Sequence, residues 1–408
     1  MRTMLSALWR TSVVGLLLSA SVVTMAGATP TSVTATRLAQ LGSGVVAMDG
    51  TNAMVGGRLG SALSHLTFFH EVGTTWVVSP MVGAMPTGPN VIVGASVALS
   101  GNDAVASSLN TKTNVRLVYF FRRVGGVWHL APGVFTDPNR NPRSESRGFL
   151  RGHYFALGMS LGSGWAFVGE PATVGGGSVV AYHRHNGWHQ VAILADPRHV
   201  ALDAFGSSVA VTPNGTTALV GALNVTAAKG KPANDGVAYE FHLQKGSWAV
   251  AQTLHEPIAA PDNLYGATVA VSNTNAVVGA FSDAGPGQHI GNEGAVYCYR
   301  LDRSGATLTQ VLHDPKEVSG DLFGAALAIS GSRVIVGALG VFSLVALRPI
   351  YTGAVYLYDL RNPGTTTTVI APNTRNLGSS VAIGSRDVWM QANGTTPNTT
   401  PFIVGGRF

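Results

Sequence analysis

The stretch from Phe205 to Tyr239, FGSSVAVTPNGTTALVGALNVTAAKGKPANDGVAY, decides the fold because the chain repeats it. A similar stretch starts at Tyr265, YGATVAVSNTNAVVGAFSDAGPGQHIGNEGAVY, and another at Phe323, FGAALAISGSRVIVGALGVFSLVALRPIYTGAVY. Each copy opens with an aromatic residue and a glycine, and each ends in an aromatic run after a long loop. Three such copies indicate a repeat architecture.

Each unit contains four short apolar runs rich in Val, Ile, Tyr and Phe, which is typical of β-strands. In the quoted unit these runs lie near Val209–Val211, Leu219–Ala222, Val237–Phe241 and Trp248–Leu254. Asn214-Gly215 separates the first two runs, and both residue types tolerate the positive φ of a tight hairpin turn. Four antiparallel strands in each unit predict the blade of a β-propeller.

Weaker openings around positions 42, 94, 156 and 378 join the three clear ones, and all are spaced by 50 to 62 residues. The last unit lacks room for a fourth strand, whereas Ser32–Ala39 is spare before the first opening. We therefore predict an all-β fold, a seven-bladed β-propeller of four-stranded antiparallel blades, closed by the N-terminal strand completing the last blade. Four tryptophans begin a predicted fourth strand, and we expect them to serve packing: Trp76, Trp128, Trp188 and Trp248.

The succession F-G-x-x-V-A-V, V-G-A and G-A-V-Y resembles the FG-GAP repeat, the blade of integrin-α-type β-propellers. The resemblance is close in three units and looser over most of the remaining chain. Many members of that family carry Asp-rich calcium loops between the first two strands. Here those loops are Thr212–Gly215, Ser272–Asn275 and Ser330–Ser332, with too few carboxylates for the 6 to 8 oxygen ligands that calcium takes. We predict no metal site and no cofactor.

Residues 1–28 have the pattern of a bacterial-type secretory signal peptide. Arg2 and Arg10 supply the charged start, 13–25 is uncharged, and 26–28 reads Ala-Gly-Ala, which fits a cleavage site. We expect 29–408 to form a single FG-GAP-like β-propeller domain that is secreted, periplasmic or displayed on the cell surface, with no membrane span after signal removal. The alternative is an uncleaved membrane anchor.

Composition excludes several function classes. The formal net charge is +6, and no Lys/Arg run of nucleic-acid-binding character is present. Cys298 is the only cysteine, so no internal disulfide forms. The chain lacks H-E-x-x-H and phosphate-loop motifs, and we identify no catalytic residue.

Two stretches are candidate partner-binding surfaces. The long loop between the second and third runs of the Phe323 unit is apolar and includes Phe342, Leu344, Leu347 and Tyr351. The alternative is a cap over an exposed blade edge. Another stretch, between two units, carries positive charges that suit an acidic glycan or surface, or form a solvated loop: Arg140, Arg143, Arg147 and Arg151.

Two further groups of residues have structural interpretations. His183, His185 and His189 lie close together in sequence, but no carboxylate accompanies them to complete a zinc or copper site. Asp203, Asp262 and Asp321 stand two or three residues before an opening aromatic, where repetition favours capping of a turn.

These observations favour a secreted, non-catalytic binding or adhesion module that uses loops on one propeller face to bind a protein or glycan. Three alternatives remain: a lectin-like propeller with sugar pockets between blades, a propeller-fold polysaccharide lyase or glycosidase, and a structural component of a surface complex. The 20 Asp and Glu residues of the whole chain weigh against an enzyme.

Overall fold

The structure is a computed structural model built from strands. It describes residues 36–39, 43–58, 64–86, 88–113, 115–136, 156, 158–171, 173, 175–199, 203–223, 236–257, 263–283, 293–315, 320–340, 342–345, 348–351, 353–362, 366–369, 374–375, 377–384, 386–394 and 402–407.

One repeat makes one antiparallel sheet whose strands follow in chain order. The quoted unit forms β16 (Phe205–Val211), β17 (Thr217–Ala222), β18 (Val237–Gln244) and β19 (Ser247–Leu254). Gly215, in the turn between β16 and β17, has the positive φ of 70° that the hairpin prediction requires.

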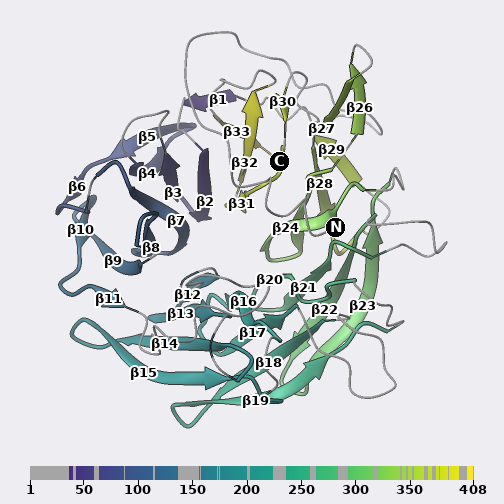
Figure 1. Ribbon diagram of the computed structural model, residues 1–408, viewed down its shortest axis with the longest axis horizontal. Coiled ribbons are helices and arrows are strands. Elements are labelled where there is room, and N and C mark those ends of the chain that lie inside the picture. The colour runs from purple at the N-terminus through teal and green to yellow at the C-terminus, as the bar shows by residue number, and fades with distance from the viewer. Residues whose placement is uncertain are drawn as a thin grey trace.

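The described strands form eight sheets: five of four strands, one of five, one of six and one of two. The larger sheets are arranged in a ring (Figure 1). The other four-stranded sheets are β2–β5 (Ser43–Asp49, Asn52–Arg58, Ser64–Val72, Thr75–Ser79), β12–β15 (Met159–Gly162, Trp165–Glu170, Ser178–Arg184, Trp188–Ala195), β20–β23 (Thr268–Val271, Asn275–Ala280, Ala295–Asp302, Gly305–His313) and β24, β25, β28, β29 (Phe323–Ser330, Arg333–Ala338, Ala354–Asp359, Thr366–Val369).

The prediction of seven four-stranded antiparallel blades is wrong, because only five of the described sheets have four strands. The six-stranded sheet includes β6, which pairs in parallel with β10, and β11, which pairs with β9. A two-residue strand is too short to show any periodicity, so β6 and β11 leave no pattern in the sequence. The strands of this sheet are β6 (Met81–Val82), β7 (Val91–Ser100), β8 (Asp103–Asn110), β9 (Arg116–Val124), β10 (Val127–Leu130) and β11 (Phe135–Thr136).

The predicted completion of the last blade by the N-terminal strand also needs correction. The C-terminal segment alone contributes four strands to the five-stranded sheet, so it is not one strand short: β30 (Thr374–Arg375), β31 (Val381–Ile383), β32 (Asp387–Gly394) and β33 (Phe402–Arg407). The fifth, β1 (Thr36–Ala39), is half the predicted length and pairs antiparallel with β33 through an irregular register between Arg37 and Ala39. Residues 32–35 lie outside the described residues.

The apolar loop of the Phe323 unit forms the two-stranded sheet by itself. β26 (Phe342–Val345) pairs antiparallel with β27 (Arg348–Tyr351), which places Phe342 opposite Tyr351 and Leu344 opposite Pro349. Figure 1 shows β26 at the periphery of the ring.

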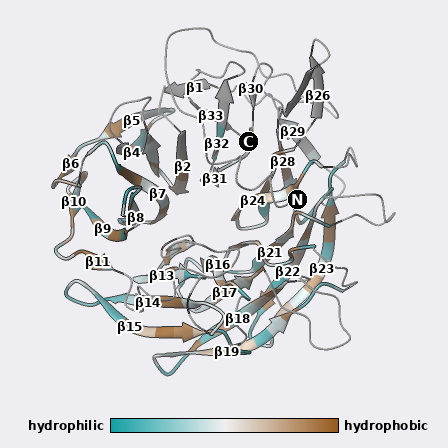
Figure 2. Cartoon of the chain, viewed as in Figure 1, coloured by the Kyte–Doolittle hydropathy of each residue, from teal (hydrophilic) through white to brown (hydrophobic). Residues whose placement is uncertain are grey.

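The core lies between neighbouring sheets rather than within one. Phe205 is fully buried in a cluster that includes Phe167 of β13 and Val179 of β14 on one side and Val220 of β17 on the other. The opening aromatic of this unit therefore packs between two neighbouring sheets. Outer strands such as β19 and β23 mix hydrophobic and hydrophilic residues (Figure 2), because one of their faces meets solvent.

Glycines permit the close approach of these sheets. Gly221 of β17 lies against the opening of the next sheet, where a Cβ would overlap the carbonyl oxygen of Gly266. Gly266 itself has φ of 83°, a left-handed conformation that side chains disfavour. In the β12–β15 unit Ala156 takes this position with φ of 59°, so the fold tolerates a Cβ there at some strain.

Candidate functional site

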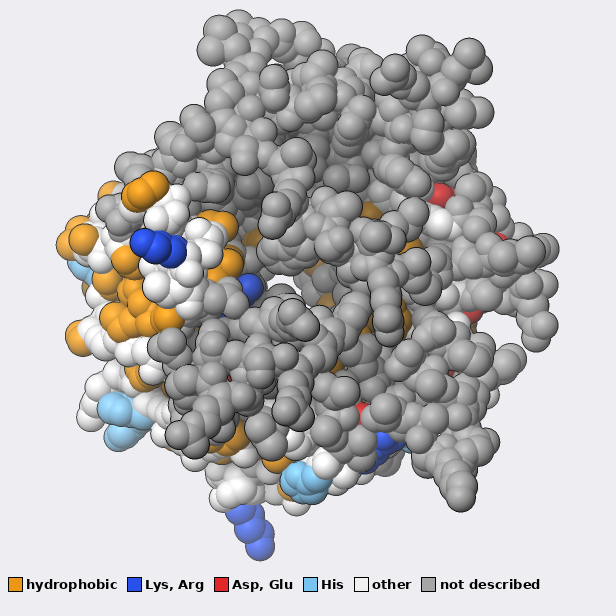
Figure 3. All heavy atoms as spheres, in the orientation of Figure 1, with side chains coloured by type: hydrophobic (Ala, Val, Ile, Leu, Met, Phe, Trp, Pro, Cys, Tyr) orange, Lys and Arg blue, Asp and Glu red, His pale blue; other side chains and the backbone are white. Residues whose placement is uncertain are grey.

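A cavity of about 360 Å³ lies among the innermost strands of the ring. Figure 3 shows a hollow near the centre of the face in view. Aliphatic side chains such as Leu99, Val211 and Ile329 form part of its wall. Innermost strands and their following turns supply the lining: β2, β7, β12, β16, β20, β24 and β31.

The turns that follow the innermost strands give this cavity a polar rim. Among the described lining residues Asp49 is the only ionisable one, and the other polar side chains are hydroxyls and one amide. Such groups donate and accept hydrogen bonds without contributing charge. The polar members of the rim are Asp49, Ser100, Ser160, Ser272, Asn273, Thr274 and Ser330.

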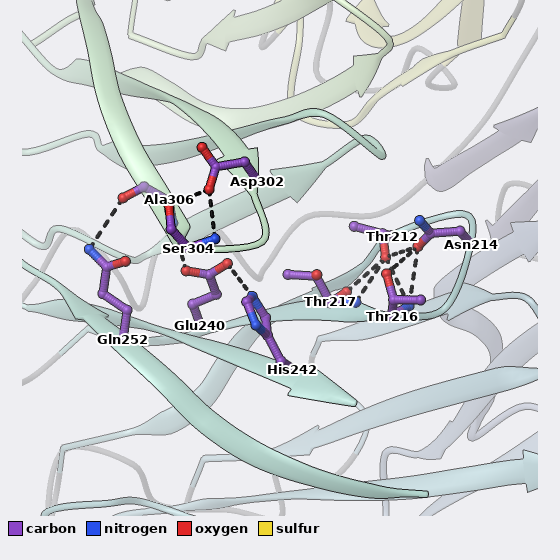
Figure 4. A network of polar contacts seen from close by, with 10 residues as sticks. All are labelled: Thr212, Asn214, Thr216, Thr217, Glu240, His242, Gln252, Asp302, Ser304 and Ala306. Carbon is purple, nitrogen blue, oxygen red and sulfur yellow. Dashed lines mark hydrogen bonds and ion pairs between the residues drawn. The ribbon is translucent and has the colours of Figure 1, made fainter. Parts of the chain in front are cut away.

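Hydrogen bonds between neighbouring turns hold this rim in place. The Gly101 N–H donates to Asp49 Oδ2 at 2.5 Å, and Ser272 Oγ donates to the Gly331 carbonyl at 2.9 Å. The Asn214 N–H donates to Asn273 Oδ1 at 3.0 Å. Within its own turn, Asn214 Oδ1 accepts a hydrogen bond from Thr212 Oγ1 at 2.6 Å (Figure 4). The rim is therefore preorganised by contacts that cross from sheet to sheet.

A second set of polar groups lies at the seams between sheets. The tyrosine of each G-A-V-Y-type run forms a hydrogen bond with a buried acid at the end of the preceding unit. Tyr356 Oη lies 2.8 Å from Asp314 Oδ1, and Tyr239 Oη lies 3.4 Å from Asp196 Oδ1. Burial and the negative charge of these acids raise the pKa of both phenols, so they remain donors.

The middle seam carries the same contact with more groups. Tyr297 Oη lies 2.6 Å from Glu256 Oε1 and 2.9 Å from Asp283 Oδ2. The Asn263 amide donates to both oxygens of Glu256, at 2.9 and 2.8 Å. Burial is the largest cause that raises the pKa of Glu256, to about 7.

The residue two positions before each opening aromatic is buried at these seams. Asp203 pairs with Arg198 at 3.2 Å, and Asp321 is fully buried. In the middle seam this place belongs to Asn263, whereas the sequence interpretation assigned it to Asp262, which lies outside the described residues.

Another buried carboxylate joins two sheets on the outer side of the ring. Glu240 of β18 is completely buried and accepts the Ala306 N–H of β23 at 2.9 Å. His242 Nε2 lies 2.7 Å from the other oxygen of Glu240, and Gln252 Nε2 donates to the Ala306 carbonyl at 3.2 Å (Figure 4).

Most of the predicted partner-binding residues cannot be placed against this cavity. Phe342, Leu344 and Tyr351 lie on the peripheral hairpin β26–β27. Leu347, Arg140, Arg143, Arg147 and Arg151 lie outside the described residues.

The histidine trio does not assemble a metal site. His183 faces the Trp165 ring at 4.5 Å and pairs across the sheet with His189, which is exposed like His185. In the part of the chain that the structure describes, no group of three or more His, Cys, Asp or Glu residues is arranged to hold a metal ion.

The four tryptophans pack between sheets, as expected. Trp128 stacks on Phe68 at 4.5 Å and Trp188 on Phe120 at 4.4 Å, each pair crossing to the preceding sheet. Trp76 meets Trp389, and Trp248 meets Phe167, edge to face.

Sequence reasoning missed the tyrosine–acid contacts. A signal was present, because an acid followed by proline ends each of three units: Asp196-Pro197, Glu256-Pro257 and Asp314-Pro315. The partner tyrosine lies 41 to 43 residues further on, which only the order of the sheets connects.

The ring of antiparallel sheets is an all-β β-propeller. Comparison with known proteins finds similarity to solved structures alone. No protein-family model matches the chain, and no curated protein matches it. A solved prolyl endopeptidase structure is 13% identical, with a TM-score of 0.51 over 88% of this chain and 46% of that one, so the chain spans less than half of that enzyme. The propeller domain of the Trilobed protease from Pyrococcus furiosus is 9% identical (TM-score 0.48, covering 88% and 95% of the two chains). The WD40 domain of Pan2 from Neurospora crassa is 12% identical (TM-score 0.48, covering 91% and 95%). At such identities the likeness concerns the fold alone.

No helix in the described part of the chain has the length and apolar character needed to cross a membrane.

Proposed function

We propose that this chain is a secreted, non-catalytic binding module of the FG-GAP type. Its ligand in this proposal is a glycan whose end enters the rim of the central cavity. The observation that carries the proposal is the rim itself, where hydroxyl and amide groups of Ser100, Asn273, Thr274 and Ser330 surround a cavity within the usual size range of ligand pockets.

The chemistry of the rim favours binding over bond cleavage. Glycoside hydrolysis uses two carboxyl groups that flank the scissile bond. Asp49 is the only carboxylate among the described lining residues, and it already accepts the Gly101 N–H. Buried acids elsewhere, such as Asp196, Glu240 and Asp314, hydrogen-bond to a neighbouring sheet, which suits a scaffold.

The experiment is a glycan array probed with the folded protein, followed by measurement of Kd for any glycan retained. Ser100→Trp fills the rim and should weaken binding at least tenfold. Ser247→Trp adds the same bulk at the exposed start of β19, far from the cavity lining, and should leave Kd unchanged.

Three results would contradict parts of this proposal. Equal binding by both variants would show that the glycan does not bind in the cavity. Retention of a protein ligand that Ser100→Trp abolishes, with no glycan bound, would change the ligand class. Cleavage of a bound glycan would replace the binding module by the enzyme alternative.

Export is a separate part of the proposal. We propose that residues 1–28 direct secretion and that the mature chain begins near Thr29. N-terminal sequencing of exported protein tests this, and an intact Met1 on that material would overturn it.

A further inference from the structure

Four polar residues meet at the seam between the β16–β19 sheet and the β20–β23 sheet. Glu256 follows β19, Asn263 precedes the opening Tyr265, Asp283 follows β21, and Tyr297 lies on β22. All four are buried, with exposed fractions of 3 to 8%. We call them the Glu256 cluster.

The Glu256 cluster has too few hydrogens if both acids are ionised. The Tyr297 hydroxyl carries one hydrogen but lies within hydrogen-bond distance of two carboxyl oxygens, 2.6 Å from Glu256 and 2.9 Å from Asp283. With two carboxylates, one of these contacts would bring two oxygens together with no hydrogen between them. A proton on Glu256 resolves this, because Glu256 then donates to Tyr297 Oη and Tyr297 donates to Asp283.

Besides burial, which raises the pKa of Glu256 most, hydrogen bonds with Tyr297 and Asn263 lower it and the charge of Asp283 raises it. None of these groups is positively charged. Asn263 donates to it, and the buried Tyr265 and Tyr299 hydroxyls, 2.5 Å from each other, lie close enough that its charge raises the pKa of both phenols. His255, the residue before Glu256, also has an interaction partner.

The equivalent seam around Asp196 differs in this respect. There Arg198 lies 3.2 Å from Asp203 and places a guanidinium beside the two acids. A positive charge therefore lies beside the buried carboxylates at that seam, unlike at the Glu256 cluster.

We propose that Glu256 and Asp283 hold one proton between them through Tyr297, and that this proton latches the two sheets together at acidic to neutral pH. Loss of the proton leaves two buried negative charges at the seam and loosens it.

The direction of the pH effect follows from the pKa of Glu256, which burial raises from 4.5 to about 7. A group whose pKa is higher in the folded state contributes stability that is complete below its unfolded value. That contribution declines as the pH rises from about 4.5 and is lost above about 7.

The test is the unfolding equilibrium of the mature chain, measured in denaturant at pH 5 and pH 8. We expect Glu256→Gln to reduce the pH dependence, because an amide donates to Tyr297 at every pH. Between pH 5 and pH 8 the unfolding constant of the wild type should rise roughly tenfold or more relative to that of this variant. A pKa difference of one unit between the folded and unfolded states changes this constant about tenfold. The matched control is Asp196→Asn at the equivalent seam, which should keep the wild-type pH dependence.

A measurement on the folded wild type gives a test that does not depend on the stability of the variants. Carboxyl-carbon NMR of the folded wild type should show one Glu resonance, absent from Glu256→Gln, that titrates with a midpoint near 7. Titration of that resonance at an ordinary Glu pKa, or an equal pH dependence in wild type and Glu256→Gln, would overturn the latch.

Discussion

Trp188 of β15 lies face to face with Phe120 of β9, with ring centroids 4.4 Å apart and planes within 15° of each other. The two residues belong to different sheets, so Trp188, the first residue of β15, packs against the preceding sheet. Trp128 repeats the arrangement on Phe68, with planes within 17°. The recurrence of tryptophan at this position therefore reflects the packing of sheet on sheet.

Replacing Trp188 by alanine should remove most of this packing contact between the two sheets. Large-to-small changes at buried aromatic residues cost about 3–5 kcal/mol of unfolding free energy. Val191 lies on the same strand and is 52% exposed, so Val191→Ala is the matched control and should change stability by less than about 0.5 kcal/mol. Denaturant melts compare the two, and equal midpoints would show that the stacking does not stabilise the ring.

The sequence predicts well whatever repeats within one unit. Val209–Val211 and Leu219–Ala222 form neighbouring strands because their alternation and the Asn214-Gly215 turn are local features. The opening aromatic and the tryptophans were also interpretable, because a large residue at the same place in several units implies one packing role.

Contacts between units were much harder to predict. Tyr297 and Glu256 lie 41 residues apart and belong to different sheets, so no local pattern joins them. The predicted surface residue Phe342 lies in a peripheral hairpin because its apolar run pairs with itself instead of joining the ring. The cavity rim could not be predicted for a similar reason, since each unit contributes only a few small polar residues, such as Ser100 or Asn273.

Gly221 offers a test of how closely neighbouring sheets approach. A Cβ at this position would overlap the Gly266 carbonyl oxygen, and backbone cannot move aside as a side chain can. Gly221→Ala should therefore cost about 1–3 kcal/mol, typical of overpacking. Gly88 is the control, because a Cβ there meets only a Val91 methyl group at an ordinary 3.8 Å. Thermal melts compare the stability of the two variants. A Gly221→Ala protein as stable as Gly88→Ala would contradict the close approach of the two sheets at Gly221.

Cys298 should be chemically silent in the folded protein. It is fully buried on β22, and burial raises the pKa of its thiol to about 12. The thiolate is the reactive form, so an aromatic disulfide reagent at pH 8 should label the native chain far more slowly than the chain in denaturant. Labelling at equal rates in both conditions would mean that β22 opens readily.

Glu240 provides the sharpest test of a single link between two sheets. Its carboxylate is fully buried, with one oxygen held by the Ala306 N–H of the next sheet and the other by His242. Glu240→Ala leaves that N–H buried without its acceptor, which costs about 1–3 kcal/mol in addition to the cavity. Glu240→Gln keeps an oxygen for Ala306 and should cost less. Asp302→Ala is the control, because Asp302 is an exposed turn carboxylate bonded to Ser304 only two residues away. Denaturant melts rank the three variants, and hydrogen exchange at the Ala306 amide should accelerate most in Glu240→Ala. If Glu240→Ala matched Asp302→Ala in both measurements, the buried carboxylate would not be joining the sheets.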